Sequence, residues 1–215
     1  MASQTGTKIS KQGLRDQVYA RLHEMIENRR FSPGERINVE KLTEELGVSR
    51  TPVWQAVGLL EKEGILVYNS YQGVFIKQLT AHQAVNLYSV RETLECMAAQ
   101  LAVNHVTSRL IGRMEKNLAE QDKIINNGQD MIAYSKLDFA FHAEIYLASQ
   151  NEYLIEFLDS IKNKMRPLVN NIAEILPGLY EDHQVILQAM KTRDAELASN
   201  TFRCHNERMK ELIIK

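Results

Sequence analysis

Residues 34–67 read GERINVEKLTEELGVSRTPVWQAVGLLEKEGILV, and their turn and helix signals decide the fold of the N-terminal part. Residues 39–46 have helical periodicity, and Gly47 can end that helix in the left-handed conformation. Ser49 can cap a second helix that continues to Gly64. Two short helices joined by a tight turn indicate a helix-turn-helix.

The flanking segments complete this unit. An amphipathic helix is expected over residues 14–29. Residues 65–68 and 74–76 are predicted to be two strands of a hairpin with Gly73 at its tip. Helix, helix, turn, helix and hairpin is the layout of a winged helix-turn-helix, which we assign to residues 11–78.

Residues 79–215 carry helical periodicity without further strand signals, which predicts an all-α antiparallel bundle. Breaks are expected at Asn-Gly and Pro-Gly pairs, including Pro177-Gly178. Pro167 predicts a kink or an early end of its helix. The expected helices cover residues 80–106, 108–126, 130–149, 153–175, 180–191 and 195–213.

The composition is that of a globular chain: 215 residues, 44% hydrophobic and 25% charged. No run of 18 apolar residues occurs, so neither a transmembrane helix nor a membrane partner is expected. Residues 1–10 are polar and predict a disordered leader rather than a secretory signal. The chain has 2 cysteines, which make no disulfide framework and indicate a reducing, cytoplasmic location.

The charge is unevenly distributed. Residues 1–79 hold 11 Lys and Arg against 9 Asp and Glu, whereas the remainder holds 15 basic and 18 acidic residues. A basic N-terminal part permits a nucleic-acid partner, but an uneven surface explains the same numbers equally well.

The second helix of the helix-turn-helix carries the candidate DNA contacts. Arg50, near its N-terminus, can hold guanine O6 and N7, and Thr51 can bind phosphate. Trp54 shares a face with Arg50 and has two interpretations: it contacts DNA, or it packs against the wing or the first helix. The candidate DNA-binding residues are Ser49, Arg50, Thr51, Trp54, Gln55, Gln72 and Gly73.

Four polar residues of the helical part form a second candidate site. Asp138 and His142 are four residues apart on one helix face, and His183 and His205 each share a face with apolar residues. Three histidines and a carboxylate from three helices can close around a divalent cation. The alternative for the Asp138–His142 pair is an ordinary ion pair or a hydrogen-bonded core pair.

The sequence from Gly34 to Val67 resembles the DNA-binding domain of GntR-family bacterial transcription regulators, and the resemblance covers residues 11–77. It implies a homodimer that binds a palindromic double-stranded operator. The chain departs from the family pattern where Trp54 and Gly58 replace basic residues and where Gln72 precedes Gly73 at the wing tip. These departures bear on the operator sequence rather than on the fold.

The helical part resembles the FCD ligand-binding domain of the FadR subgroup, in its metal-binding branch. The matching pattern is Asp138-x-x-Phe-His142, followed by His183 and His205. The resemblance implies that these four residues bind zinc, nickel or manganese and that a small organic acid acts as effector. Arg91 matches an arginine that can face the effector pocket; its alternative is a salt bridge with Glu95 or with a neighbouring helix.

These features predict a regulator rather than an enzyme, in which a metal and a carboxylate effector modulate DNA binding in the bacterial cytoplasm. No paired acid/base carboxylates are found beside the proposed ligands, and no Gly-x-Ser-x-Gly motif is present. Three alternatives remain: a metal-free regulator that binds an acyl ligand, a metal-dependent enzyme fused to a winged helix, and a protein-interaction module.

Overall fold

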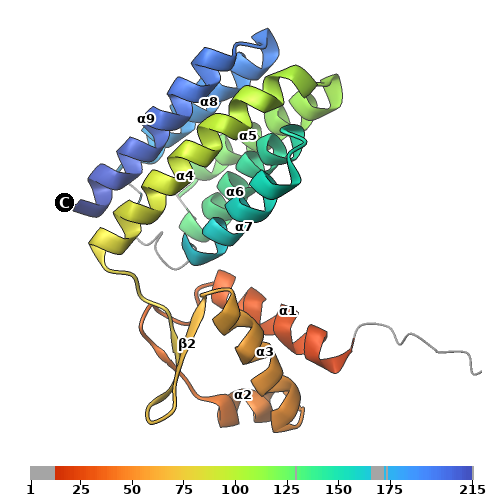
Figure 1. Ribbon diagram of the computed structural model, residues 1–215, viewed down its shortest axis with the longest axis vertical. Helices are drawn as coiled ribbons and strands as arrows, with labels where there is room; N and C mark the ends of the chain where they lie inside the picture. The colour runs from red at the N-terminus through yellow and green to blue at the C-terminus, as the bar shows by residue number, and fades with distance from the viewer. Residues whose placement is uncertain (1–12, 129, 166–171, 173, 215) are drawn as a thin grey trace, which may run out of the picture. The chain divides into compact units, whose positions relative to one another are not determined.

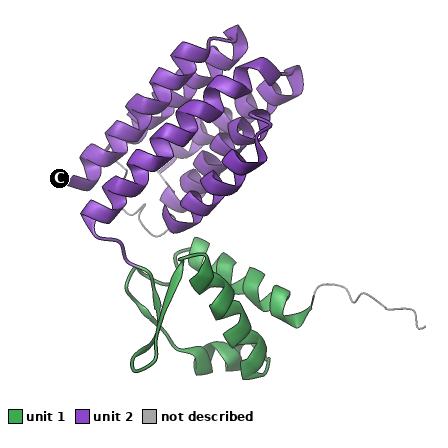
Figure 2. Ribbon diagram, viewed as in Figure 1, with its two compact units in different colours: residues 1–77 green, residues 78–215 purple. Residues whose placement is uncertain are grey.

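The computed structural model describes residues 13–128, 130–165, 172 and 174–214 (Figure 1). The chain divides after Lys77 into two compact units (Figure 2). The leader expected at residues 1–10 lies outside the described residues. Within the described ranges, no helix is long and apolar enough to cross a membrane.

The first unit is a winged helix-turn-helix, as predicted. Its strands form an antiparallel sheet in the order β1-β3-β2. Strand β1 is not predicted by the sequence pattern, because it is only 2 residues long and forms by pairing with the distant β3. The elements are α1 (Leu14–Glu27), β1 (Arg36–Ile37), α2 (Val39–Leu46), α3 (Arg50–Lys62), β2 (Leu66–Asn69) and β3 (Gly73–Ile76).

Local signals set the helix-turn-helix. The Asn38 side chain caps α2 by accepting a hydrogen bond from the Lys41 amide at 3.0 Å. Gly47 then ends α2 with a φ of 63°, in the left-handed region. Helix α3 buries Val53 and Val57 among its core residues, so its opposite face is left for other contacts.

The second unit is all-helical within the described residues, which confirms the predicted fold class. The Thr80 side chain and Gln83 form a capping box that starts α4. The elements are α4 (Ala81–Ala102), the short 3-10 helix η1 (Val103–His105), α5 (Ser108–Asn126), α6 (Met131–Ala148), α7 (Glu152–Met165), α8 (Leu176–Thr192) and α9 (Ala195–Ile214).

Two expectations concern the segment between α7 and α8. The predicted break at Pro177-Gly178 is wrong: α8 begins at Leu176, and Pro177 lies in its first turn. A proline is tolerated there because the first amide groups of a helix have no intrahelical acceptor. The kink expected at Pro167, and most of residues 166–175, fall outside the described part of the chain.

The bundle is held mainly by α4 against α9, with α8 against α9 and α5 against α6 (Figure 1). Its interior is not wholly apolar. Arg91, Glu95, His142, His183 and His205 are all buried. Buried polar and charged groups are costly unless they are paired, so their partners define the interior site.

Candidate metal centre and DNA-reading surface

Helices α6, α8 and α9 bring together the four residues of the predicted metal centre. Asp138 and His142 come from α6, His183 from α8 and His205 from α9. One ligand atom from each residue lies within 4.8 Å of all the others. The three imidazoles are buried, and the Asp138 side chain is 16% exposed. We call these four residues the histidine cluster.

The spacing within the histidine cluster suits a tetrahedral metal ion. His142 Nε2 lies 3.2 Å from His183 Nε2, and Asp138 Oδ1 lies 3.4 Å from His183 Nε2 and 3.8 Å from His142 Nε2. The rings of His183 and His205 are stacked with centroids 5.0 Å apart. Nitrogen ligands at about 2.0–2.1 Å from zinc in tetrahedral geometry are roughly 3.3 Å apart. The shorter of these distances are close to that ligand spacing, whereas the whole set spreads over as much as 4.8 Å.

Outer partners orient two of the three rings. His142 Nδ1 lies 2.6 Å from Glu95 Oε1, and His183 Nδ1 lies 2.9 Å from Gln121 Oε1. In protein metal sites a histidine usually binds the ion through one nitrogen and donates the other N–H to such an acceptor. The two rings are therefore fixed with Nε2 toward the cluster.

His205 is held less tightly. Its Nδ1 lies 3.5 Å from Asp182 Oδ2, and this buried atom has no hydrogen-bond partner in the described chain. An unpaired buried nitrogen is costly unless another group satisfies it. The donor set of three buried imidazoles and a carboxylate fits a resident divalent metal.

The charge state of the histidines also suits metal binding. Burial lowers the pKa of His183 well below its ordinary value, and the neighbouring His205, His142 and Arg91 oppose a further positive charge and lower it more. Burial lowers the pKa of His142 as well, although the Glu95 charge opposes the shift. Both rings are therefore neutral near neutral pH, and neutral imidazole is the form that ligates metals.

Glu95 is the centre of the outer hydrogen-bond network. It is completely buried and accepts hydrogen bonds from the Tyr146 hydroxyl and from Asn206 Nδ2, the latter at 2.7 Å. Burial alone would raise the pKa of this carboxyl, but Arg91, His142 and the hydrogen bonds together hold it below its ordinary value. Glu95 thus remains charged beside the histidine cluster.

The salt-bridge interpretation of Arg91 is confirmed, and its role toward an effector stays a prediction. Its Nη2 lies 2.9 Å from Glu95 Oε1, so the salt bridge exists. It also lines a cavity of about 20 Å³ beside the cluster, which is large enough for about one water molecule. The cavity is lined by Tyr88, Arg91, Ser135, Asp138, Phe139, Ile172, Leu179, His205 and Met209.

Sequence reasoning did not identify the outer partners Gln121, Asp182 and Asn206, nor the contact of Glu95 with His142. Gln121 and Asn206 are completely buried in helices. The helical sequence pattern alone does not predict which buried partner such a polar residue contacts. The pairing of Glu95 with Arg91 was predictable, because Glu95 lies four residues after Arg91 on the same helix face.

The predicted DNA contacts of α3 lie on its solvent side. Arg50, Thr51 and Gln55 are exposed, and Arg50 forms an exposed ion pair with Glu40 at 3.1 Å. Ser49 is the N-cap residue, but its side chain makes no capping hydrogen bond. These side chains lie at the helix N-terminus, the position from which recognition helices contact base edges.

Trp54 both packs and remains exposed. Its ring meets Tyr68 of β2 edge-on, with centroids 5.3 Å apart and planes at 79°. Even so, 41% of Trp54 is accessible to solvent, as is 45% of Tyr68. The two rings form an aromatic surface between α3 and the wing.

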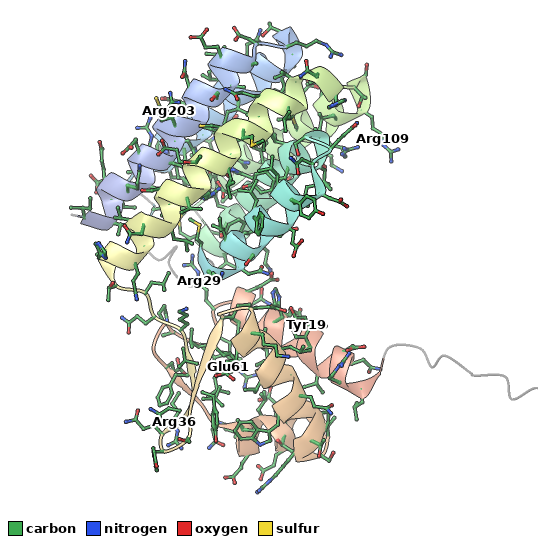
Figure 3. The ribbon with its side chains drawn as sticks, in the orientation of Figure 1. Tyr19, Arg29, Arg36, Glu61, Arg109 and Arg203 are labelled. Atoms are coloured by element: carbon green, nitrogen blue, oxygen red, sulfur yellow. The ribbon has the colours of Figure 1, made fainter. Side chains whose placement is uncertain are left out.

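The wing presents a polar and aromatic tip. Gln72 is exposed, and Gly73 has a φ of 102°, which a residue with a side chain rarely adopts. A Cβ at Gly73 would also come within 3.2 Å of Arg36 Nε; Figure 3 shows Arg36 beside the hairpin. Tyr71, which the sequence reasoning missed, is 97% exposed at the same tip.

Family models match both units. Residues 14–76 match "Bacterial regulatory proteins, gntR family", and residues 86–208 match "FCD domain". The chain is 31% identical over 192 residues to YdhC, an uncharacterized HTH-type transcriptional regulator of Bacillus subtilis, covering 88% of this chain and 86% of that protein. It is 38% identical over 138 residues to the Nta operon transcriptional regulator of Aminobacter aminovorans, covering 63% of this chain and 64% of that protein.

The fold is shared with solved structures. The Escherichia coli protein McbR/YncC superposes with a TM-score of 0.83 at 24% identity, covering 95% of this chain and 98% of that one. The chain thus belongs to the GntR family of bacterial regulatory proteins. It is a transcriptional regulator with a GntR DNA-binding domain, residues 14–76, and an FCD ligand-binding domain, residues 86–208.

Proposed function

We propose that this regulator binds a palindromic operator as a homodimer and that a divalent metal and a small organic acid in the FCD domain modulate this binding. The observation that carries the proposal is the histidine cluster, whose four ligand atoms lie within 4.8 Å of one another. A buried group of three histidines and one carboxylate is a donor set that suits a divalent cation. It acts in the cytoplasm, where bacterial DNA is found.

Asp138, His142, His183 and His205 would hold the metal, and the identity of the ion is zinc, nickel or manganese. When bound, the metal supplies a Lewis-acidic position for an oxygen ligand. Arg91 lines the cavity next to Asp138 and adds a positive charge for an anionic effector, which would require the cavity to widen beyond the volume of about one water molecule. Helix α4 carries Arg91 and packs against α9, which carries His205, so the site can bias how these helices pack.

The DNA-binding unit would read the operator through α3. Arg50 can form two hydrogen bonds with guanine, and Thr51 and Ser49 can donate to phosphates. Two-fold symmetry of the dimer requires two related half-sites in the operator. An enzyme is not supported: the relatives described above are transcription regulators.

Elemental analysis of untagged protein tests the metal. The parent is expected to hold about one divalent ion per chain, and His183→Ala is expected to lose most of it. His105→Ala is the matched control, because His105 is exposed and lies outside the cluster. Equal metal contents in the parent and in His183→Ala would show that the proposed ligands are wrong.

Selection from randomised DNA followed by gel shift tests the operator. A palindrome bound by a dimer is expected, and its affinity should change when a small organic acid is added with the metal present. If no palindrome is selected, the DNA-binding part of the proposal fails even if the metal is found.

A further inference from the structure

Tyr134 contains an unexplained polar group in the interior of the FCD domain. The residue is completely buried, and its hydroxyl has no hydrogen-bond partner in the described chain. An unpaired buried hydroxyl costs free energy, whereas phenylalanine would fill almost the same volume without that cost. Within the described residues, the Tyr134 hydroxyl is therefore left with an unused hydrogen-bonding position.

The position of Tyr134 indicates what that partner is. Tyr134, Asp138 and His142 follow one another at intervals of four on α6, so they lie along one stripe of the helix. Tyr134 also packs in the same apolar cluster as Leu179 and Met209, two residues that line the cavity beside the histidine cluster. The hydroxyl therefore belongs to the surroundings of the candidate metal centre.

The chemistry of the hydroxyl restricts the ligand further. Burial raises the pKa of Tyr134, and the negative charges of Asp138 and Asp182 raise it further, so the hydroxyl keeps its proton. A protonated hydroxyl held in place offers one hydrogen-bond donor. The Arg91 guanidinium lines the cavity beside Asp138 and adds a positive charge there. A donor and a guanidinium favour an anionic oxygen over an ammonium group.

We propose that the Tyr134 hydroxyl is a binding group for the effector and donates a hydrogen bond to a carboxylate oxygen of a small organic acid held beside Asp138. This inference rests on the proposed function, since it requires that the histidine cluster holds a metal and an oxygen ligand. It adds a residue to the site and assigns it the role of a neutral donor.

A hydroxyl that binds a ligand and one that supports the fold give opposite results in Tyr134→Phe. The experiment loads the protein with Co²⁺ and titrates it with acetate, following the visible absorption of the bound metal. Tyr134→Phe should bind Co²⁺ like the parent but lose about tenfold in acetate affinity, as expected for one charge-assisted hydrogen bond. In urea, the metal-free variant should be as stable as the parent or more so.

The matched control is Tyr180→Phe, a tyrosine of α8 that is only partly buried. It should leave both Co²⁺ and acetate affinities unchanged. An acetate affinity within about twofold of the parent in Tyr134→Phe would overturn the inference, and so would a clear loss of urea stability in the metal-free variant. If the parent takes up no Co²⁺, the proposed metal function itself fails. This result appears in the Co²⁺ loading step, before acetate is added, so it is distinct from a failure of the Tyr134 proposal.

Discussion

The Nδ1 atom of His142 lies 2.6 Å from the Oε1 atom of Glu95, and both side chains are fully buried. The same carboxylate is paired with Arg91 and bonded to Asn206 and Tyr146. Glu95 thus connects α4, α6 and α9 at the edge of the histidine cluster. It both orients a proposed metal ligand and balances a buried guanidinium.

Glu95→Gln should weaken both the fold and the metal site. The amide keeps the shape of the side chain but removes the charge that Arg91 requires, and breaking a buried ion pair costs on the order of 3 kcal/mol. Loss of an outer acceptor for a ligating histidine lowers metal affinity about 10- to 100-fold. Urea denaturation and a competitive zinc titration measure the two effects.

The control for this variant is Glu144→Gln, which breaks the exposed pair between Glu144 and Arg113. Exposed pairs add little to stability, so neither measurement should change. If the two variants behave alike, Glu95 has no special role in the site.

The metal-free protein should lose stability on mild acidification. Burial lowers the pKa of His142 and His183 in the folded chain, whereas unfolding returns them to about 6.5. Below that pH the unfolded chain binds protons that the folded chain does not. The free energy of unfolding then falls by up to about 1.4 kcal/mol per pH unit for each histidine.

Urea midpoints of chelator-treated protein at about pH 7.5 and about pH 5.5 measure this effect. Glu95, whose pKa is lowered, stabilises the fold above its unfolded pKa of about 4.3 and loses that contribution only at more acidic pH. His183→Gln should show a smaller decrease, and His105→Gln the full one. A midpoint that stays constant over this range would contradict the assignment of neutral buried histidines.

Two glycines of the DNA-binding unit should respond to alanine in opposite directions. Gly47 has a φ of 63° and Gly58 lies within α3, and a Cβ at either position would meet no atom within 4 Å. Gly47→Ala should therefore cost about 1 kcal/mol of backbone strain. Gly58→Ala should gain about 1 kcal/mol, because alanine favours helix.

Thermal unfolding of the two variants provides the measurement, and each serves as the control for the other. A destabilised Gly58→Ala would mean that space near α3 is more restricted than the structure shows. A neutral Gly47→Ala would mean that the turn can change its conformation without cost.

Trp54→Arg should change the selected operator at one base position in each half-site. The exposed indole offers an apolar contact for a thymine methyl, whereas arginine prefers guanine O6 and N7. A preference of about 1–3 kcal/mol per position is expected for such contacts. Selection from randomised DNA with the parent, Trp54→Arg and Trp54→Phe measures it.

The phenylalanine variant keeps an apolar ring and should retain most of the parent preference. If Trp54→Arg selects the same bases as the parent at every position, then the contact with Tyr68 is the only role of the indole. In that case Arg50 is the base-reading residue on this face of α3.

The fold was largely predictable from the sequence because its signals are local. The turn at Gly47, the apolar stripe of α3 and the capping residue Thr80 each act within a few neighbouring positions. Strand β1 and the start of α8 at Leu176 were missed, since one depends on pairing with a distant strand and the other on a proline in the first helical turn.

The site was predictable in part. Asp138, His142, His183 and His205 were singled out by their spacing and by a family resemblance, and the structure brings them together; metal binding stays a prediction. The outer partners could not be found, because the contact between Gln121 and His183 joins residues 62 positions apart on different helices. No local pattern encodes such a contact.

The connection between the two units has a mechanical consequence. The Lys77 amide still donates a hydrogen bond to Ile65, and Thr80 already belongs to the capping box of α4. Only Gln78 and Leu79 lie between them, which leaves about four soft backbone torsions. Since α4 also carries Arg91 and Glu95, any movement of this helix on ligand binding would be passed to the wing through Gln78 and Leu79 alone.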